Sequence, residues 1–409
     1  GGSDNRVVGN DIYAIGAHGI ALSGGDRITL TPGNNVAENN YIHHVGVFYK
    51  QGVGITMHGC GLRAAHNLIH DGPRMGIMFS GNNLVIEYNH IRHVNLETED
   101  TGAVYTGGRD WISSRGTVIR YNYFHDILGY GRTNGKWVSP HFAWGVYLDD
   151  NAGGVDVIGN ILQRCPRAGI HLHNGRDNLI ENNIILDSAM QQVEMNGWTP
   201  QARHWVNHFS DMVRNYEAVV NQPAWKGMRN MGTHPSQAVL PDGLIMTGNV
   251  FRRNILAYSD PKAKCFRFSR VPFDRHESDH NLIWHGGKPV LIEGLPGVDP
   301  EEQWAEWQKR GKDTHSVIAD PRFVNARKGD YRLRPDSPAL KLGFEQIPVE
   351  KIGPYRSDLR ATWPIVEAEG AREKPIGAER PETAAVAAPN PRHEKPFRVP
   401  RIAKPDAFP

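Results

Sequence analysis

Carboxylate, imidazole and phenol side chains alternate with apolar residues in three short segments near the middle of the chain. The segments are Gly145-Val-Tyr-Leu-Asp-Asp150, Gly169-Ile-His-Leu-His173 and Val193-Glu-Met-Asn196. Side chains of a strand alternate between its two faces, so the polar members of each segment share one side. These polar members are Tyr147, Asp149, His171, His173, Glu194 and Asn196. Such groups exchange protons in acid–base catalysis, which predicts chemistry on this face if the segments lie side by side.

Two phrases that recur along the chain predict that arrangement. The first is Asn-x-apolar, at Asn40, Asn67, Asn89, Asn122, Asn160 and Asn183, and again at Asn249, Asn254 and Asn281. The second is a glycine followed by alternating apolar residues, at Gly54, Gly76, Gly102, Gly145 and Gly169. A repeat of 20–50 residues is typical of a solenoid, and the short apolar stretches favour strands. The Leu-x-x-Leu-x-Leu pattern of leucine-rich repeats is absent.

The sequence therefore predicts an all-β fold, a right-handed parallel β-helix whose rungs are about 4.8 Å apart. Asparagine suits its corners, because it tolerates the left-handed backbone region and can bond to the next rung. The chain starts Gly-Gly-Ser-Asp already inside the repeat, without an evident terminal cap, so we expect an N-terminally incomplete protein. We predict one β-helix domain over residues 1–355 and an irregular, Pro-rich, extended or disordered tail over 356–409.

Alignment of the rungs on the glycines gives two columns that point outward. They are Thr56, Met78, Val104, Tyr147, His171 and Glu194, and His58, Ser80, Thr106, Asp149, His173 and Asn196. Histidine-rich corners follow the asparagine phrase, at His43-His44, His70-Asp71, Arg92-His93 and His125-Asp126. Their regular recurrence favours a stacked surface ladder over metal ligands.

Five carboxyl groups are candidates for catalysis. Asp149 and Glu194 lie two predicted rungs apart, Asp150 and Asp110 follow strand ends on adjacent rungs, and Asp100 precedes its strand. Carboxyl groups about 5 Å apart suit a retaining glycosidase, and a separation of about 10 Å is near the inverting range. Asp100 reaches the face only if the loop 96–100 folds over it. Spacing alone does not choose among these pairs.

Insertions are expected beside this face. The loop 129–143 is rich in Gly, Trp and His, and residues 199–240 interrupt the repeat with a helical stripe over 203–222 that ends before Pro223. The aromatic residues of this insertion predict packing against the solenoid, or else the wall of a cleft. A second short helix is predicted near residues 299–312.

Composition excludes some functions. The chain has 409 residues, a net charge of +2 and a pI near 8.4, which gives no case for nucleic acid. No apolar run approaches the ~20 residues of a membrane span. Cys60, Cys165 and Cys265 are too far apart for a disulfide framework or a metal motif, and Cys60 and Cys165 are expected in or beside the core. The oligomeric state is not indicated.

Several segments resemble bacterial right-handed β-helix proteins of carbohydrate metabolism, most closely glycoside hydrolase family 141. The resemblance covers about residues 30–345 and is carried by residues 97–111, 120–126, 145–150, 169–173, 320–323 and 335–340. It implies a secreted or periplasmic enzyme that hydrolyses a plant-type glycan, such as xylan or a fucosylated pectin side chain. It also implies two catalytic aspartates, one from Asp100 or Asp110 and one from Asp149 or Asp150.

Our first hypothesis is a glycoside hydrolase that needs no cofactor or metal. Its predicted sugar contacts are Tyr147, His171, His173, Asn196, Arg109, Trp137, His141 and Trp144. The alternative is a polysaccharide lyase that uses an arginine, from Arg109, Arg167 or Arg270, and such lyases often need Ca²⁺. A third is a glycan-binding solenoid without catalysis.

Overall fold

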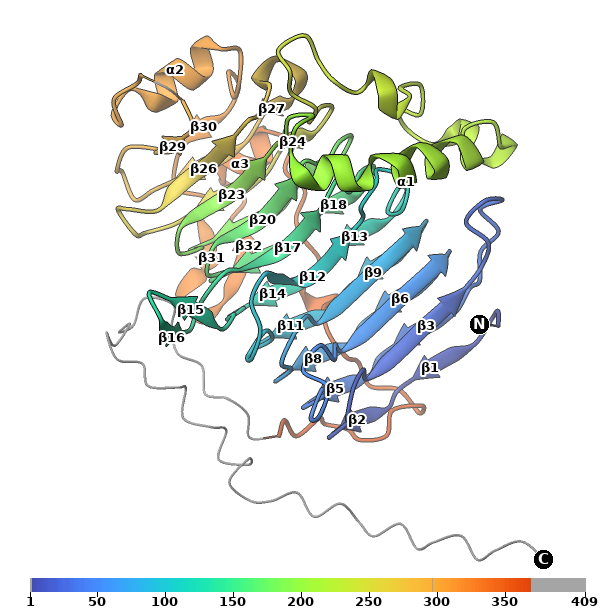
Figure 1. Cartoon of the computed structure of the whole chain (residues 1–409). Coiled ribbons are helices and arrows are strands. Elements are labelled where there is room, and N and C mark those ends of the chain that lie inside the picture. The colour runs from blue at the N-terminus through green and yellow to red at the C-terminus, as the bar shows by residue number, and fades with distance from the viewer. Residues whose placement is uncertain (1, 296, 369–409) are drawn as a thin grey trace, which may run out of the picture.

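Short strands separated by tight corners wind into successive rungs of a right-handed parallel β-helix (Figure 1). The computed structural model describes residues 2–295 and 297–368. Each rung contributes one strand to each of three parallel sheets. The predicted fold class is confirmed.

The first two sheets consist of short strands. The first sheet contains β1 (Arg6–Val8), β4 (Val36–Glu38), β7 (Arg63–Ala65), β10 (Val85–Glu87), β13 (Val118–Arg120), β18 (Asp156–Ile158), β21 (Leu179–Glu181), β24 (Val250–Arg252) and β27 (Glu277–Asp279). The second contains β2 (Asp11–Tyr13), β5 (Tyr41–His43), β8 (Leu68–His70), β11 (His90–Arg92), β14 (Tyr123–His125), β19 (Ile161–Gln163), β22 (Ile184–Leu186), β25 (Ile255–Ala257), β28 (Leu282–Trp284) and β30 (Val317–Ile318).

The third sheet has mostly longer strands and carries the polar face. It contains β3 (Ile20–Gly24), β6 (Ile55–Cys60), β9 (Ile77–Asn82), β12 (Thr101–Gly107), β17 (Ala143–Asp149), β20 (Ala168–His173), β23 (Gln191–Asn196), β26 (Lys264–Ser269) and β29 (Ile292–Glu293). The inward residues of the three sheets form one continuous core. Cys60, Cys165 and Cys265 are free thiols and fully buried, as expected for Cys60 and Cys165.

The asparagine phrase forms a buried ladder between the first and second sheets. The side chain of Asn89, for example, accepts from the backbone N–H of Asn67 at 3.1 Å and donates to the Oδ1 of Asn122 at 2.9 Å. The ladder runs through Asn10, Asn40, Asn67, Asn89, Asn122, Asn160, Asn183, Asn254 and Asn281. The predicted rung-to-rung bonding is confirmed.

Two details of the ladder differ from expectation. The left-handed residue is the one before the ladder asparagine, as at Asn39 (φ 57°) and His66 (φ 55°). That residue turns the corner, which leaves the asparagine side chain free to bond along the axis. Asn249 belongs to a separate corner, where it accepts from Asn178.

The register of β12 corrects one rung of the predicted columns. Tyr105 pairs with Met78 and with Tyr147, whereas Val104 pairs with the inward residues Ile77 and Val146. Likewise Gly107, and not Thr106, lies beside Asp149. The outward residue lies three positions after Gly102, but two positions after the other glycines of the phrase. Counting two residues from Gly102 therefore selected an inward residue, Val104. The outward column therefore presents a tyrosine where valine was predicted.

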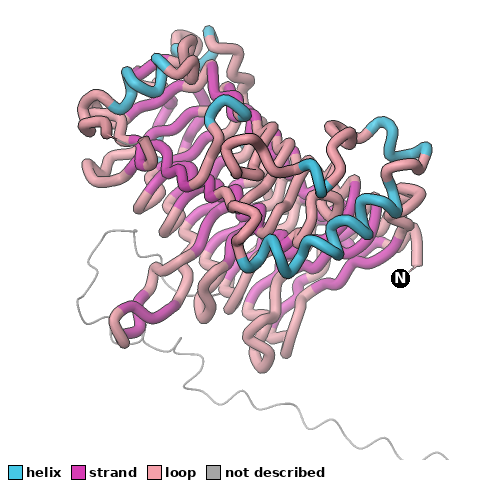
Figure 2. Tube along the Cα trace, turned by 45° about the horizontal axis from the view of Figure 1, so that its top comes forward, coloured by secondary structure: helices cyan, strands magenta, loops and turns pink. Residues whose placement is uncertain are grey.

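The helical insertion is confirmed, with α1 spanning Arg203–Val219. Its buried residues are Trp205, Met212, Tyr216 and Val219, whose spacing of three, four and seven places them on one face of the helix. Val206, which the predicted stripe included, is 60% exposed. Figures 1 and 2 show α1 beside the carboxyl ends of the third-sheet strands. The other described helices are η1 (Pro223–Gly227), η2 (Pro235–Gln237), η3 (Phe273–Arg275), α2 (Gln303–Lys309), η4 (Ala326–Lys328), α3 (Pro338–Lys341) and η5 (Val349–Lys351).

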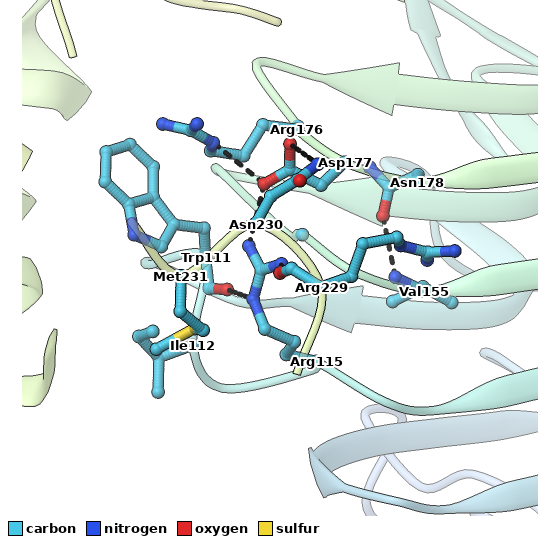
Figure 3. Close-up of polar contacts among 12 residues, drawn as sticks. Trp111, Ile112, Arg115, Val155, Arg176, Asp177, Asn178, Arg229, Asn230 and Met231 are labelled. Atoms are coloured by element: carbon cyan, nitrogen blue, oxygen red, sulfur yellow. Dashed lines mark hydrogen bonds and ion pairs between the residues drawn. The ribbon is translucent and has the colours of Figure 1, made fainter. Parts of the chain in front are cut away.

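A buried ionic cluster fixes the end of this insertion to the solenoid (Figure 3). The Arg115 guanidinium donates to Asp177 at 3.0 Å, and Arg176 and Asn230 donate to the same carboxylate, each at 3.0 Å. Arg115 also donates to the backbone carbonyl of Arg229. Because Asn230 and Arg229 belong to the insertion, these contacts hold it against the rungs.

The segment after the last rung turns back along the molecule. A hairpin of β31 (Phe323–Asn325) and β32 (Asp330–Leu333) is followed by a stretch that we term the C-terminal strap, residues 345–368. Its backbone bonds to Asn182, Tyr88, Asn39 and Gly9, which belong to successively earlier rungs. Residues 356–368 therefore contact the first rungs, contrary to the boundary predicted at 355. Residues 369–409 of the predicted tail lie outside the described residues.

The histidine corners stack in part, and most of their histidines are buried instead of lying on the surface as predicted. The rings of the corner residues His43 and His70 stack at 5.5 Å, whereas His125 lies 5.0 Å from His90, which precedes a corner. His70 is 1% exposed, because the outer face of the second sheet is covered by later parts of the chain. The strap contributes there through Ala368, whose N–H donates to Tyr41, and through Glu367, which pairs with Arg92.

Within residues 2–295 and 297–368, no helix is both long and apolar enough to cross a membrane.

Candidate functional site

Asp149 is a buried acidic group with several hydrogen-bond donors, at the carboxyl end of the third sheet. It ends β17 and is only 6% exposed. Its carboxylate accepts from the Tyr105 hydroxyl at 2.8 Å, from His173 Nδ1 at 2.7 Å and from the backbone N–H of Asp150 at 2.8 Å. Burial works to raise the pKa of Asp149, but the bonds from His173 and Tyr105 outweigh burial and lower it. Asp149 is therefore ionised at neutral pH.

The indole of Trp198 fixes the proton arrangement of His173. Trp198 Nε1 lies 3.0 Å from His173 Nε2, and an indole nitrogen can only donate. His173 Nε2 must therefore accept, which leaves the ring proton on Nδ1, directed at Asp149. This Trp198–His173–Asp149 chain holds the carboxylate in one orientation.

Asp100 supplies a second carboxyl group with the opposite tendency. It lies just before β12, with φ of 54°, and its N–H donates to the Phe142 carbonyl at 2.9 Å. The Tyr147 hydroxyl donates to its Oδ1 at 3.3 Å, so the loop 96–100 does fold over the face. Although the residue is exposed, the protein atoms packed around its carboxyl group and the charge of Asp149 raise the pKa of Asp100.

The pKa values of the two aspartates therefore shift in opposite directions. One carboxyl group retains its proton to a higher pH than usual, and its neighbour loses its proton at a lower pH. Titratable groups whose environments move their pKa values apart are the usual mark of an acid/base pair. Tyr147 contacts Asp100. Burial raises the pKa of Tyr147 most, and the negative charges of Asp149 and Asp100 raise it further. Tyr147 is therefore a hydrogen-bond donor to the pair.

Asp150 faces the helical insertion. It is 3% exposed and pairs with Arg109, whose side chain is 54% exposed. His208 Nε2 and His173 Nδ1 each lie 3.7 Å from its carboxylate oxygens. His204 is one turn before His208 on α1, and its ring stacks 5.6 Å from that of Trp198. The insertion packs against the solenoid, as one of the two sequence interpretations predicted, and places His208 beside Asp150. The sugar-binding cleft of the other interpretation stays a prediction.

Two predicted catalytic carboxylates have structural surroundings instead. Asp110 is 2% exposed, and one oxygen accepts from Ile112 N–H and Ser113 N–H while the other accepts from Asn215 of α1. It closes a turn and attaches the helix.

Glu194 is fully buried and cannot meet a substrate. Arg167 donates two hydrogen bonds to its carboxylate, at 2.8 and 2.9 Å, and Arg267 and Trp144 also donate to it. Burial opposes ionisation, but these cations and donors hold the pKa of Glu194 well below its usual range. It is a structural anion and not a reserve acid.

The predicted sugar contacts divide into buried and accessible groups. Trp144 and His171 are at most 2% exposed, and the Asn196 side chain is bonded to Glu194 and Arg267. These three support the site from behind, as does Tyr147, which is 3% exposed.

Trp137 and Arg109 remain available to a ligand, whereas Glu99 and Thr133 engage the two ring nitrogens of His141. The loop 129–143 forms a hairpin of β15 (Gly131–Thr133) and β16 (Lys136–Val138), on which Trp137 is 45% exposed and stacks on Tyr130 at 4.9 Å. His141 pairs with Glu99 at 2.6 Å and joins the hairpin to the loop that carries Asp100. Among the arginines proposed for a lyase, Arg167 is committed to Glu194, whereas Arg270 is exposed.

Four residues of the site were absent from the sequence prediction, namely Tyr105, Trp198, His204 and His208. The register shift at β12 hid Tyr105. His204 and His208 are four residues apart, which places them on the same face of a helix, and that spacing was a usable signal.

One comparison with known proteins, a family model, agrees with the architecture. Residues 1–142 match a family model described as "Right handed beta helix region". None of the curated proteins matches the chain. A solved structure described as a glycoside hydrolase is 16% identical with a TM-score of 0.31, over 46% of this chain and 30% of its own. Another, a PL6 family polysaccharide lyase from Pseudopedobacter saltans, is 14% identical with a TM-score of 0.35, over 87% of this chain and 96% of its own. The chain thus spans less than a third of the first of these proteins.

Proposed function

We propose that the protein is a carbohydrate-active enzyme, and specifically a glycoside hydrolase that acts on a polysaccharide or oligosaccharide. The observation that supports this proposal most is the pair of aspartates with opposite pKa shifts, Asp100 raised and Asp149 lowered. Glycosidases need one carboxyl group that is protonated and one that is ionised on either side of the scissile bond.

In this mechanism Asp100 is the general acid and protonates the leaving oxygen. Asp149 is the nucleophile or the base. The hydrogen bonds from Tyr105 and His173 hold its charge in place. Exposed Trp137 offers an aromatic surface for a sugar ring, and Arg109 offers donors for hydroxyl groups.

The hydroxyl of Tyr147 donates to Asp100 at 3.3 Å and also lowers the pKa of Asp149, so both carboxyl groups lie near this phenol. Carboxyl groups about 5 Å apart would retain the anomeric configuration, and a separation of about 6.5–9.5 Å would invert it. Proton NMR of the first product formed would distinguish the two outcomes.

A polysaccharide lyase is the second candidate, and exposed Arg109 is the observation in its favour. A guanidinium beside the acid pair could bind the carboxylate of a uronate. Against it, burial and the charge of Asp149 raise the pKa values of Tyr105 and Tyr147, which makes both phenols poor bases. A lyase would release unsaturated products that absorb in the ultraviolet.

The test is a panel of neutral and uronate-containing plant glycans, assayed for reducing ends and for ultraviolet absorbance. We expect reducing ends without absorbance. Asp149→Asn and Asp100→Asn should each lower kcat by at least about 10²-fold, since each removes a proton-transfer or covalent step. Asp211→Asn is the matched control, because Asp211 is an exposed aspartate on α1.

Wild-type rates in both Asp149→Asn and Asp100→Asn would reject the assignment of these residues. Ultraviolet-absorbing product would identify a lyase instead. Binding of a glycan with no turnover across the panel would identify a non-catalytic glycan-binding solenoid.

A further inference from the structure

We propose that Asp150, His204 and His208 form a binding site for a divalent transition-metal ion, with Zn²⁺ as the reference ion. The three side chains can each direct one ligand atom into a common space, with all of these atoms within 4.8 Å of one another. They join the end of a third-sheet strand to one face of α1. A metal site was not expected from the sequence.

The chemistry of this donor set selects the kind of ion. Two imidazoles and one carboxylate match the ligands of Zn²⁺ and its first-row neighbours, whereas Ca²⁺ prefers six to eight oxygens. Ligand atoms of a tetrahedral Zn²⁺ site lie about 3.3 Å apart. His208 Nε2 is 3.7 Å from Asp150 Oδ2, so small side-chain rotations suffice.

An unpartnered nitrogen supports the proposal independently. His208 Nε2 is buried from solvent and forms no hydrogen bond within the described part of the chain. A buried polar atom without a partner is uncommon and calls for an explanation. Its position beside the Asp150 carboxylate is explained if both atoms are ligands of one ion.

A second grouping of Asp149, Asp150 and His173 also satisfies the spacing, but it is a poorer site. Trp198 donates to His173 Nε2, and the proton on Nδ1 bonds to Asp149. Both ring nitrogens are therefore in use. His204, in contrast, is exposed on α1 and can turn toward Asp150. An ion bound by Asp150 would replace its contact with Arg109, whose side chain can withdraw into solvent.

The test uses the full chain after treatment with EDTA, titrated with Zn²⁺ alone and without glycan. Calorimetry should show one tight equivalent. We expect His204→Ala and His208→Ala each to weaken that affinity by at least about tenfold, because loss of even an outer-shell partner has an effect of that size. Arg109→Gln should strengthen binding, since it removes the competing cation. Co²⁺ added in place of Zn²⁺ should show visible absorption that both histidine variants lose.

His280→Ala and His315→Ala are the matched controls, because these residues and Asp279 form another histidine–aspartate group. Tight binding that is lost only in these controls would overturn the proposal, as would unchanged affinity in both His204→Ala and His208→Ala, or no tight binding by the wild type. His204 is exposed, so its variant should fold even if His208→Ala does not. Metal binding without glycan turnover would support this site and reject the hydrolase. Glycan turnover without metal binding would support the hydrolase and reject this site.

Discussion

At the scale of single residues, the site depends on how two aspartates differ. Asp149 is surrounded by donors, while Asp100 has one phenol and faces the charge of its neighbour. Donors lower the pKa of a carboxyl group, and a neighbouring negative charge raises it. The electrostatic coupling between Asp100 and Asp149 can be measured without knowledge of the substrate.

Two substitutions should move the pKa of Asp100 in opposite directions. The charge of Asp149 raises this pKa, so Asp149→Asn should lower it. The bond from Tyr147 lowers it, so Tyr147→Phe should raise it further. Carbon-13 NMR of the labelled carboxyl group measures both shifts. Asp211→Asn should leave the value unchanged, and shifts of the same sign in the two site variants would contradict the assigned coupling.

Removal of the buried charge at Glu194 should strongly destabilise the fold. Glu194→Gln leaves Arg167 and Arg267 without their buried partner, so we expect a loss of about 3 kcal/mol in the free energy of unfolding. Glu293→Gln is the control, because this residue pairs with Arg267 at a 41% exposed position and should cost under about 1 kcal/mol. Urea unfolding measures both.

The effect of Glu194→Gln should depend on pH. Because folding lowers the pKa of Glu194 from its ordinary value of 4.5, its contribution is complete above that value and declines as the pH falls below it. The difference in the free energy of unfolding between the wild type and Glu194→Gln should therefore become smaller as the pH falls. A difference that grows as the pH falls would show that the charge of Glu194 is not stabilising.

The sequence indicated the residue types of the candidate site better than their surroundings. Asp149 and Asp110 are both aspartates that end a segment of the repeat, yet one meets a histidine and a tyrosine and the other closes a turn under α1. That difference arises from contacts between distant parts of the chain, which local spacing does not contain.

At the scale of elements, the asparagine ladder sets the rungs and α1 closes the site. The ladder was predictable because one residue type recurs at one corner. The position of Tyr105 was not, since Gly102 is offset by one residue and a shift of one reverses the face of every side chain in a strand. The path of α1 depends on contacts to the solenoid such as Asn215–Asp110 and Trp205–Trp111, which the helical stripe alone did not reveal.

A single ladder asparagine should contribute substantially to stability. Asn122 is fully buried, accepts from the Asn89 N–H at 2.8 Å and donates to the Ile86 carbonyl at 2.9 Å. Asn122→Ala leaves both backbone groups unpaired, and we expect a loss of about 3 kcal/mol. The control is Asn207→Ala, at an exposed position of α1, which should be neutral or slightly stabilising. Equal thermal stability of Asn122→Ala and Asn207→Ala would show that the hydrogen bonds of Asn122 do not stabilise the fold.

At the scale of the whole molecule, a repeat explains most of the architecture and a non-repetitive segment completes it. The period predicted the β-helix because each rung lies on the previous one. The strap has no such period. The Pro-rich sequence from residue 356 was therefore predicted to be a tail, although residues 356–368 reach back to the first rung, where Arg360 bonds to Asn10.

Arg360 should stabilise the contact between the strap and the first rungs. It is 8% exposed and donates to the carbonyls of Asn10 at 2.9 Å and Asn39 at 3.2 Å, and it pairs with Asp11. Arg360→Ala leaves these groups without their partner, and we expect a loss of about 2 kcal/mol that is local to the first rungs.

Amide hydrogen exchange measures this effect by position. Exchange should accelerate in residues 6–13 and 36–43 of Arg360→Ala and stay unchanged in residues 161–186, which lie several rungs away. Arg356→Ala, at an exposed position of the same strap, should exchange like the wild type. Uniform acceleration along the chain would mean that the rungs unfold as one unit. Local acceleration would show that the strap caps the first rungs, as the outward edge of a solenoid requires.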